Sequence, residues 1–264
     1  MKLVALDLDG TLIGRDLVIR PRVKETIAKL RERGIAGCIV TGRMYAATLP
    51  FARELGFDAP LVCYQGAAIV DPQSDRVLRD IPLQPETVRA IVDLAQRDGV
   101  HLQLYRNDEY YCEAANRFSE LYASLSRKEP VVVASLRESF AFSPATKAVV
   151  ICDPPQAERY VERVREKLGD LAYVTRSYPE FIEILDPKVD KGNALRFIAA
   201  HLGIEMRDIM AVGDSWNDAP LLEAAGIGIA MGSAPPELRS VAHAVVADIE
   251  GDGVAEAIER YALN

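Results

Sequence analysis

Short apolar runs alternate with amphipathic segments in the first third of this chain. Residues 3–8 are apolar except for Asp7, and similar runs follow at 35–40 and 61–70. Between the first two runs, residues 21–34 repeat apolar side chains at helical spacing, beginning with a proline and ending with a glycine. The order strand, helix, strand favours right-handed crossovers between parallel strands.

The same pattern returns near the C-terminus. Residues 193–204 predict a helix with one apolar face, and strands are expected at 208–214, 226–232 and 243–248. Glycines separate these short strands, which we interpret as a continuation of the first sheet. The sequence therefore predicts an α/β fold with a Rossmann-like parallel sheet core.

The middle of the chain has a different character. Strands are expected in 100–114, 147–155 and 178–187, with amphipathic helices at 85–99 and 156–169. Aromatic and charged residues are interleaved here more than in the flanking regions.

Prolines at both ends of this middle region indicate crossings between two domains. We expect a discontinuous core domain formed by residues 1–81 and 188–264. Residues 82–187 would form an inserted α+β module.

Composition and charge narrow the function classes. A net charge of -8 disfavours a general nucleic-acid binder, which normally has a basic surface. No apolar stretch reaches the length of a membrane span, and Asp7 and Asp9 interrupt the first apolar run too early for a signal peptide. The four cysteines are scattered, which is typical of reduced thiols. We expect a soluble, cytoplasmic protein of unknown oligomeric state.

The segment DLDGT at 7–11 has the strongest chemical signal. Asp7 and Asp9 lie at the end of a buried strand, where open α/β sheets bind ligands. Two carboxylates so close together are costly unless a cation or a shared proton compensates, and a hard divalent cation such as Mg²⁺ prefers oxygen ligands. The alternative is a helix cap within a surface turn, because Asp, Gly and Thr all favour turns.

Two further strand ends place polar groups at the same edge. Thr41 and Gly42 follow the run at 35–40 and could cradle an anion, although a threonine cap with a flexible glycine would look the same. Asp214, Asn217 and Asp218 follow the strand at 208–214. They could form part of a metal site or an Asx-turn that opens the next helix.

Lys191 lies just before a predicted helix, where an isolated lysine is usually a solvated surface group. Its significance comes from the combination, because parallel strands would bring Asp7, Thr41 and Asp214 to one edge of one sheet. Carboxylates, a metal ion and a cationic clamp on phosphate are what phosphoryl transfer requires.

In this order the motifs closely resemble those of the haloacid dehalogenase superfamily, and its Cof-like phosphatase branch with a large inserted cap in particular. The resemblance rests on DLDGT at 7–11, VTGR at 40–43, DKGNAL at 190–195 and GDSWNDAPLL at 213–222. It extends over nearly the whole chain. The first and last motifs are highly specific, whereas the other two count through their order and spacing.

The resemblance implies a role for each site residue. Asp7 would be the nucleophile and Asp9 the general acid and base. The phosphoryl group would be bound by Thr41, Gly42, Lys191 and Asn217. Mg²⁺ would be held by Asp7, the Asp9 carbonyl and Asp214, with Asn217 and Asp218 completing or orienting the site.

Three residues near these motifs have no assigned role. Family members commonly have Asn-Gly where this chain has Gln65-Gly66, and the longer amide could reshape the pocket wall. Trp216 either lines the substrate entrance or packs the loop. Arg43 is a candidate second cation, or else a helix-start arginine paired with a surface acid.

The sequence therefore predicts an enzyme, a Mg²⁺-dependent phosphatase of sugar phosphates or related small phosphorylated metabolites. A phosphomutase using the same aspartyl-phosphate is the nearest alternative, and a catalytically silent ligand-binding protein is a more distant one. No motif identifies the substrate. In the cap, polar or aromatic side chains without any motif behind them are Tyr105, Arg106, Asp108, Tyr178 and Glu180.

Overall fold

The computed structural model describes residues 1–264 and divides them into two compact units. The first unit comprises Met1–Arg79 and Asp190–Asn264, and the second comprises Asp80–Val189. None of the helices is both long and apolar enough to cross a membrane. All four cysteines are buried free thiols.

The first unit contains a five-stranded, fully parallel sheet in the order β14-β13-β12-β1-β2. Its strands are β1 (Leu3–Leu6), β2 (Ala36–Ile39), β12 (Ile209–Gly213), β13 (Ile227–Ala230) and β14 (Ala244–Val245). Its helices are α1 (Pro21–Glu32), α2 (Tyr45–Leu55), α7 (Lys191–Leu202), α8 (Ala219–Ala224), α9 (Pro236–Val241) and α10 (Gly253–Tyr261). The predicted α/β class with a parallel sheet core is confirmed.

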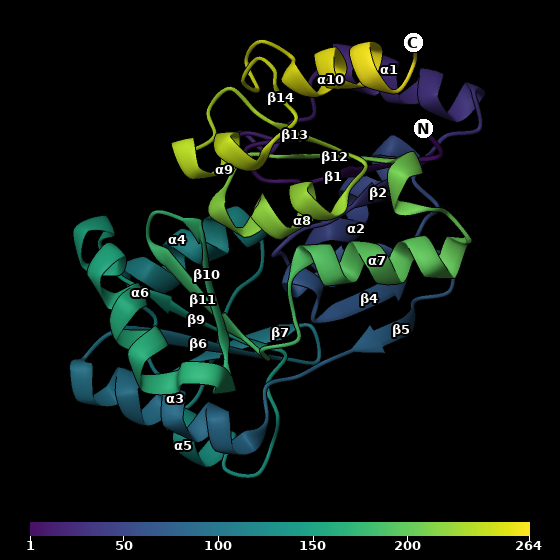
Figure 1. The fold of residues 1–264 in the computed structure, drawn as a ribbon. Coiled ribbons are helices and arrows are strands. Elements are labelled where there is room, and N and C mark those ends of the chain that lie inside the picture. Colours follow the sequence, from purple (N-terminus) through teal and green to yellow (C-terminus); the bar gives the residue numbers. More distant parts are fainter. The chain divides into compact units, whose positions relative to one another are not determined.

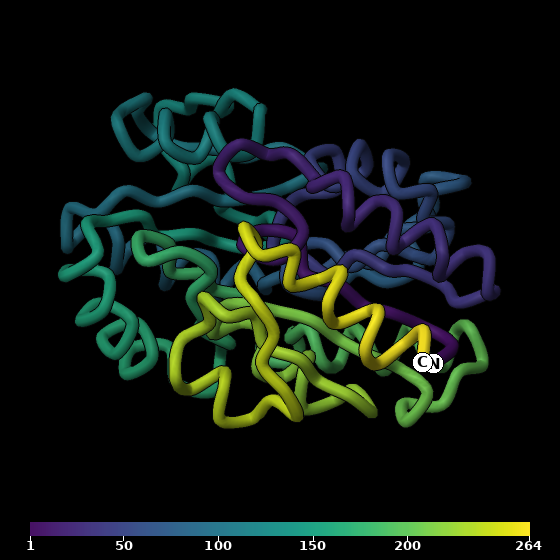
Figure 2. The backbone as a smooth tube through the Cα atoms, turned by 90° about the horizontal axis from the view of Figure 1, so that it is seen from above, coloured from purple at the N-terminus to yellow at the C-terminus, as the bar shows by residue number.

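Helices cover both faces of this sheet, because its central strands are apolar on both sides. Figure 1 shows α1 and α10 on one face and α7 and α8 on the other. Leu3 and Ala5 of β1 share a buried cluster with Leu195 and Ile198 of α7. In the tube view the yellow C-terminal helix runs beside α1 (Figure 2), and Arg22 donates to Glu259 across that contact at 2.8 Å.

The segment at 61–70 corrects the sequence-based expectation of one strand. It forms two antiparallel strands, β3 (Leu61–Cys63) and β4 (Ala68–Asp71), separated by a tight turn at Tyr64–Gly66. They form a small sheet with β5 (Arg76–Asp80). The apolar run is continuous because both strands are buried, and its only turn signal is Gly66.

The second unit is a six-stranded sheet in the order β10-β11-β9-β6-β7-β8. Its strands are β6 (His101–Arg106), β7 (Glu109–Cys112), β8 (Val131–Val132), β9 (Lys147–Ile151), β10 (Tyr173–Tyr178) and β11 (Phe181–Leu185). Its helices are α3 (Pro85–Asp98), α4 (Arg117–Ser126), α5 (Leu136–Ser139) and α6 (Pro154–Leu168). Apolar residues of α3 and α6 pack on Leu102, Leu104 and other residues of one sheet face.

Candidate active site

The end of β1 places Asp7 at the carboxyl edge of the parallel sheet. The Asp7 backbone N–H still donates to the Val212 carbonyl at 3.0 Å, so the residue continues the ladder between β1 and β12. Gly10 then turns the chain with a φ of +84°, and a Cβ there would lie 2.2 Å from Oδ2 of Asp214. Glycine is needed at this position because the turn presses against the carboxylate that ends β12.

Asp218 organises the loop that follows β12. Its Oδ2 accepts from the backbone N–H groups of Asp214 and Ser215 at 2.9 and 3.0 Å. This carboxylate is completely buried. These bonds run back to preceding residues and form a capping box with Ser215, in place of the Asx-turn that the sequence allowed as an alternative. The second oxygen of the same side chain accepts from Lys191.

Lys191, the first residue of α7, is the cation at the centre of this cluster. Its Nζ donates to Oδ1 of Asp7 at 2.6 Å and to Oδ1 of Asp218 at 2.5 Å. The residue is 1% exposed, so it is not the solvated surface lysine that its isolated position allowed. Burial alone would lower the pKa of Lys191, but Asp218 and Asp7 raise it above its ordinary value.

Asp7, Asp214 and Asp218 form a compact set of oxygen ligands. Each offers a carboxylate oxygen, and these oxygens all lie within 4.8 Å of one another. Burial raises the pKa of Asp7 to about 7 and raises that of Asp214 well above its ordinary value, and repulsion among the carboxylates adds to both shifts. Thr11 donates to Oδ1 of Asp214 at 2.9 Å.

The charge of this set fits a divalent cation. When all three carboxylates are ionised, they and the one ammonium group give a net charge of -3 + 1 = -2 in a largely buried site. Hard oxygen ligands in this arrangement are what Mg²⁺ prefers in proteins, and a divalent ion would offset the repulsion that raises the carboxyl pKa values.

Asp9 points away from this set toward Arg43. Both oxygens of Asp9 accept hydrogen bonds from the Arg43 guanidinium, at 2.7 and 2.6 Å. The side chains of Asp9 and Arg43 are 18% and 9% exposed. The bidentate geometry makes this one of the stronger ion-pair types. Arg43 thus pairs with an acid of the DLDGT motif and not with a surface acid.

Thr41 and Gly42 follow β2 in the loop that leads to Arg43. The Thr41 hydroxyl accepts from the backbone N–H of Arg43 at 3.1 Å, and the Thr41 N–H donates to the Val62 carbonyl at 2.9 Å. Thr41 is 1% exposed. Its hydroxyl hydrogen is not used in the bond to Arg43, so the group can still donate to an anion.

Asn217 contacts Gln65, for which the sequence predicts no definite role. Its Nδ2 donates to Oε1 of Gln65 at 3.0 Å, and both side chains are buried. The only sequence signal for Gln65 was its departure from the Asn-Gly pair common in the family. Trp216 is about a third exposed, as a side chain at the edge of its loop would be.

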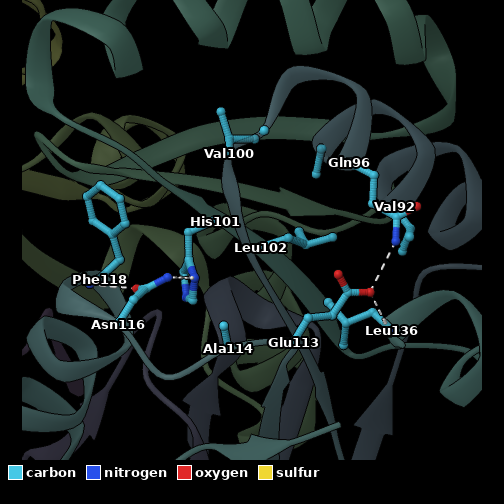
Figure 3. Close-up of a pocket in the computed structure, with 12 residues that line it drawn as sticks. Val92, Gln96, Val100, His101, Leu102, Glu113, Ala114, Asn116, Phe118 and Leu136 are labelled. Carbon is cyan, nitrogen blue, oxygen red and sulfur yellow. Dashed lines mark hydrogen bonds between the residues drawn. The ribbon is translucent and has the colours of Figure 1, made fainter. Parts of the chain in front are cut away.

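Figure 3 shows a cavity of about 370 Å³ that is lined entirely by residues of the second unit. His101 and Asn116 lie on one side and Glu113 on the other, and none of the predicted site residues lines it.

Tyr105 and Arg106, two candidate residues of the second unit, make local contacts. The Tyr105 hydroxyl donates to Gln103 inside the sheet, and the Arg106 guanidinium stacks over Phe140. Sequence reasoning missed the buried pair of Lys147 and Glu183, whose Nζ and Oε2 are 2.8 Å apart.

Comparisons with known proteins agree on one family. A family model described as haloacid dehalogenase-like hydrolase matches residues 4–258. The chain is 29% identical over 271 residues to pyridoxal phosphate phosphatase YbhA of Escherichia coli (strain K12), with 99% of each chain covered. It is 29% identical over 274 residues to 5-amino-6-(5-phospho-D-ribitylamino)uracil phosphatase YitU of Bacillus subtilis (strain 168), covering 98% of this chain and 97% of that protein.

Comparison with solved structures supports the same family. A haloacid dehalogenase-like hydrolase from Bacteroides thetaiotaomicron superposes with a TM-score of 0.86 at 27% identity, and the match covers 98% of each chain.

Proposed function

This chain belongs to the haloacid dehalogenase-like hydrolases, and on that premise we propose that it is a Mg²⁺-dependent phosphatase of small phosphomonoesters. The reaction would pass through an aspartyl-phosphate on Asp7. The observation that supports this most strongly is the buried contact of Lys191 with Asp7 and Asp218 at the carboxyl edge of the parallel sheet. A merely structural sheet edge has no need of three carboxylates around one lysine.

In the first step, a carboxylate oxygen of Asp7 attacks phosphorus and the bond from phosphorus to the ester oxygen breaks. Asp9, once it has left Arg43 and taken up a proton from solvent, gives that proton to the departing alkoxide. In the second step Asp9 takes a proton from water, whose oxygen attacks phosphorus and releases inorganic phosphate, restoring the Asp7 carboxylate. Splitting one displacement into two is the usual advantage of a covalent nucleophile.

Several site residues would stabilise the negative charge of the phosphoryl group. Lys191 offsets the repulsion between the Asp7 carboxylate and the phosphoryl dianion. Thr41, Gly42 and the second N–H of the Asn217 amide, the one not used by Gln65, donate to the phosphoryl oxygens. A Mg²⁺ held by Asp7, Asp214, Asp218 and the Asp9 carbonyl would supply further charge neutralisation. Asp9 would have to release at least one of its two bonds to Arg43 to face the leaving oxygen.

The proposed substrate class is a small phosphorylated metabolite, such as a sugar phosphate. The named relatives act on pyridoxal phosphate and on a phosphoribitylamino-uracil, both of which are phosphate esters of small organic molecules. We retain residues 82–187 as the proposed specificity domain and a cytoplasmic location for the enzyme. The net charge of -8 continues to disfavour nucleic acid as a partner.

The test is hydrolysis of a panel of phosphomonoesters by the full chain with Mg²⁺, compared with Asp7→Asn. We expect the wild type to release inorganic phosphate and the variant to lose at least about 10³-fold in kcat, because the nucleophile is absent. Equal rates for the two proteins would overturn the mechanism. Product analysis separates the alternatives, since a phosphomutase would give an isomeric sugar phosphate and a silent binder would give no product.

A further inference from the structure

The turn at Tyr64–Gly66 is unusual in its backbone. Tyr64 and Gln65 are consecutive non-glycine residues with φ of 51° and 60°, and Gly66 follows at 105°. L-residues rarely adopt this left-handed region, and such strain persists only where the surrounding structure holds it.

Contacts on both sides hold this turn in place. The Tyr64 N–H donates to the Arg43 carbonyl at 2.9 Å, and the Gln65 N–H donates to the Thr41 carbonyl at 3.0 Å. On the other side, a Cβ at Gly66 would lie 2.8 Å from the carbonyl oxygen of Asp190. The turn that contains Gln65 therefore lies between the Thr41–Arg43 loop and the start of α7, whose first residue is Lys191.

The side chain of Gln65 meets that of Asn217, and the pair is incompletely satisfied. The Asn217 Nδ2 donates to Gln65 Oε1 at 3.0 Å, while Gln65 Nε2 and Asn217 Oδ1 find no partner within the chain. The two residues are only 1% and 5% exposed. Buried donors and acceptors without a partner are rare in folded proteins.

This result does not depend on which way either amide is oriented. One contact between two carboxamides always consumes one N–H and one carbonyl oxygen. If both groups were turned over, Gln65 would donate to Asn217, and a buried donor and a buried acceptor would still remain. A ligand that accepts one hydrogen bond and donates another would satisfy both groups.

We propose that Gln65 is a phosphate-binding residue, whose amide N–H donates to a phosphoryl oxygen while Asn217 holds the amide in position. This inference rests on the proposed function and extends it to a residue outside the four motifs. Hydrogen phosphate, the reaction product, has both an acceptor oxygen and a P–OH donor, so it can satisfy the two groups together. The phosphoryl dianion of a substrate satisfies the donor, and a water molecule can satisfy the acceptor.

The experiment uses inorganic phosphate as the probe with the full chain and Mg²⁺. Gln65→Met removes both polar atoms at nearly constant length. Gln65→Glu removes the free N–H donor but keeps an acceptor for the Asn217 N–H. Because that hydrogen bond is retained, we expect Gln65→Glu to fold even if Gln65→Met does not. Gln73→Met is the matched control, because Gln73 is exposed and its side chain bonds to Asp58, outside the proposed site.

At pH 8 we expect both Gln65 variants to weaken phosphate binding about tenfold or more, and Gln65→Glu most, because its ionised carboxylate repels the anion. The inhibition constant of phosphate and the KM should rise together, while Gln73→Met should match the wild type. Folded variants with unchanged inhibition constants and KM would overturn the inference.

A second readout separates this inference from the proposed function. Phosphate should raise the melting temperature of the wild type, and this shift should shrink in both Gln65 variants even if no phosphomonoester is hydrolysed. A wild type that hydrolyses phosphomonoesters while the Gln65 variants keep the full shift would leave the proposed function intact and reject the role of Gln65.

Discussion

The Nζ of Lys191 lies 2.6 Å from Oδ1 of Asp7, although the two residues are 184 positions apart in the sequence. This contact joins the first turn of α7 to the end of β1. A second bond to Asp218 extends it to the loop after β12. One ammonium group therefore links the proposed nucleophile to the loop that carries the proposed metal ligands.

Removing this cation should reduce both activity and stability. For Lys191→Met we expect kcat to fall at least about 10²-fold, because the charge opposing carboxylate–phosphate repulsion is lost. The variant also leaves buried carboxylates without their partner, which costs about 3–5 kcal/mol. Single-turnover kinetics and urea unfolding measure the two effects.

Lys24→Met provides the control, because Lys24 forms an exposed ion pair with Glu54. Its loss should cost at most about 1 kcal/mol and leave kcat unchanged. A Lys191→Met enzyme with wild-type turnover would contradict the role given to this lysine.

Mg²⁺ binding should release protons. Without metal, burial holds the pKa of Asp7 at about 7, so the carboxyl is partly protonated near neutral pH. A divalent cation favours the ionised form and lowers that pKa, so protons leave as the ion binds and apparent affinity rises from pH 6 to pH 8. Calorimetry in buffers of different ionisation enthalpy measures the number of protons released per Mg²⁺ bound. Binding without any proton release would contradict this site.

His101 should make the second unit less stable in acid. The Asn116 Oδ1 accepts from the Phe118 N–H at 2.9 Å, which turns its Nδ2 toward Nδ1 of His101 at 3.1 Å. Protonation would place an N–H at Nδ1 of His101 directly against the N–H of Asn116 Nδ2, so their hydrogen bond would be lost. Burial also lowers the pKa of His101 from 6.5 to about 4. The unfolded chain takes up the proton first, so this contribution to stability falls as pH drops from about 6.5 to 4.

Urea unfolding at pH 7 and pH 5 tests this effect. The wild type should lose more stability between the two pH values than His101→Gln, which has no ring to protonate. Identical losses would show that the ring does not sense pH in this way.

The buried pair of Lys147 and Glu183 should behave as a unit. Their side chains are 2% and 3% exposed, so Lys147→Met strands a buried carboxylate and should cost about 3–5 kcal/mol. Adding Glu183→Leu should recover most of that loss, because the second substitution removes the stranded charge. Unfolding of both single variants and the double variant gives the coupling, and additive losses would argue against it.

Residues at strand ends were the part of the site that the sequence could predict. Asp7, Thr41 and Asp214 each follow an apolar run, and parallel strands necessarily bring such residues to one edge. Lys191 needed the resemblance, because an isolated lysine has no local signal for burial. The four motifs identified the superfamily correctly.

The other features of the fold and the site depend on contacts between distant residues, which no local sequence pattern predicts. Tyr64 and Gln65 occupy left-handed conformations without being glycine or asparagine, so the turn between β3 and β4 was interpreted as part of one strand. The contact between Gln65 and Asn217 joins positions 152 residues apart. Lys147 begins β9 and Glu183 lies in the middle of β11, and no spacing in the sequence indicates that the two side chains meet.

The central position of β1 has a consequence for how the chain folds as it is made. Leu3 pairs with Ala36 on one side but with Ile209 on the other. At ordinary synthesis rates of about 5–20 residues per second, β12 emerges about 10–40 s after β1. One edge of β1 stays open throughout that interval and is a template for unwanted pairing. The inserted second unit thus delays completion of the sheet that positions the proposed catalytic residues.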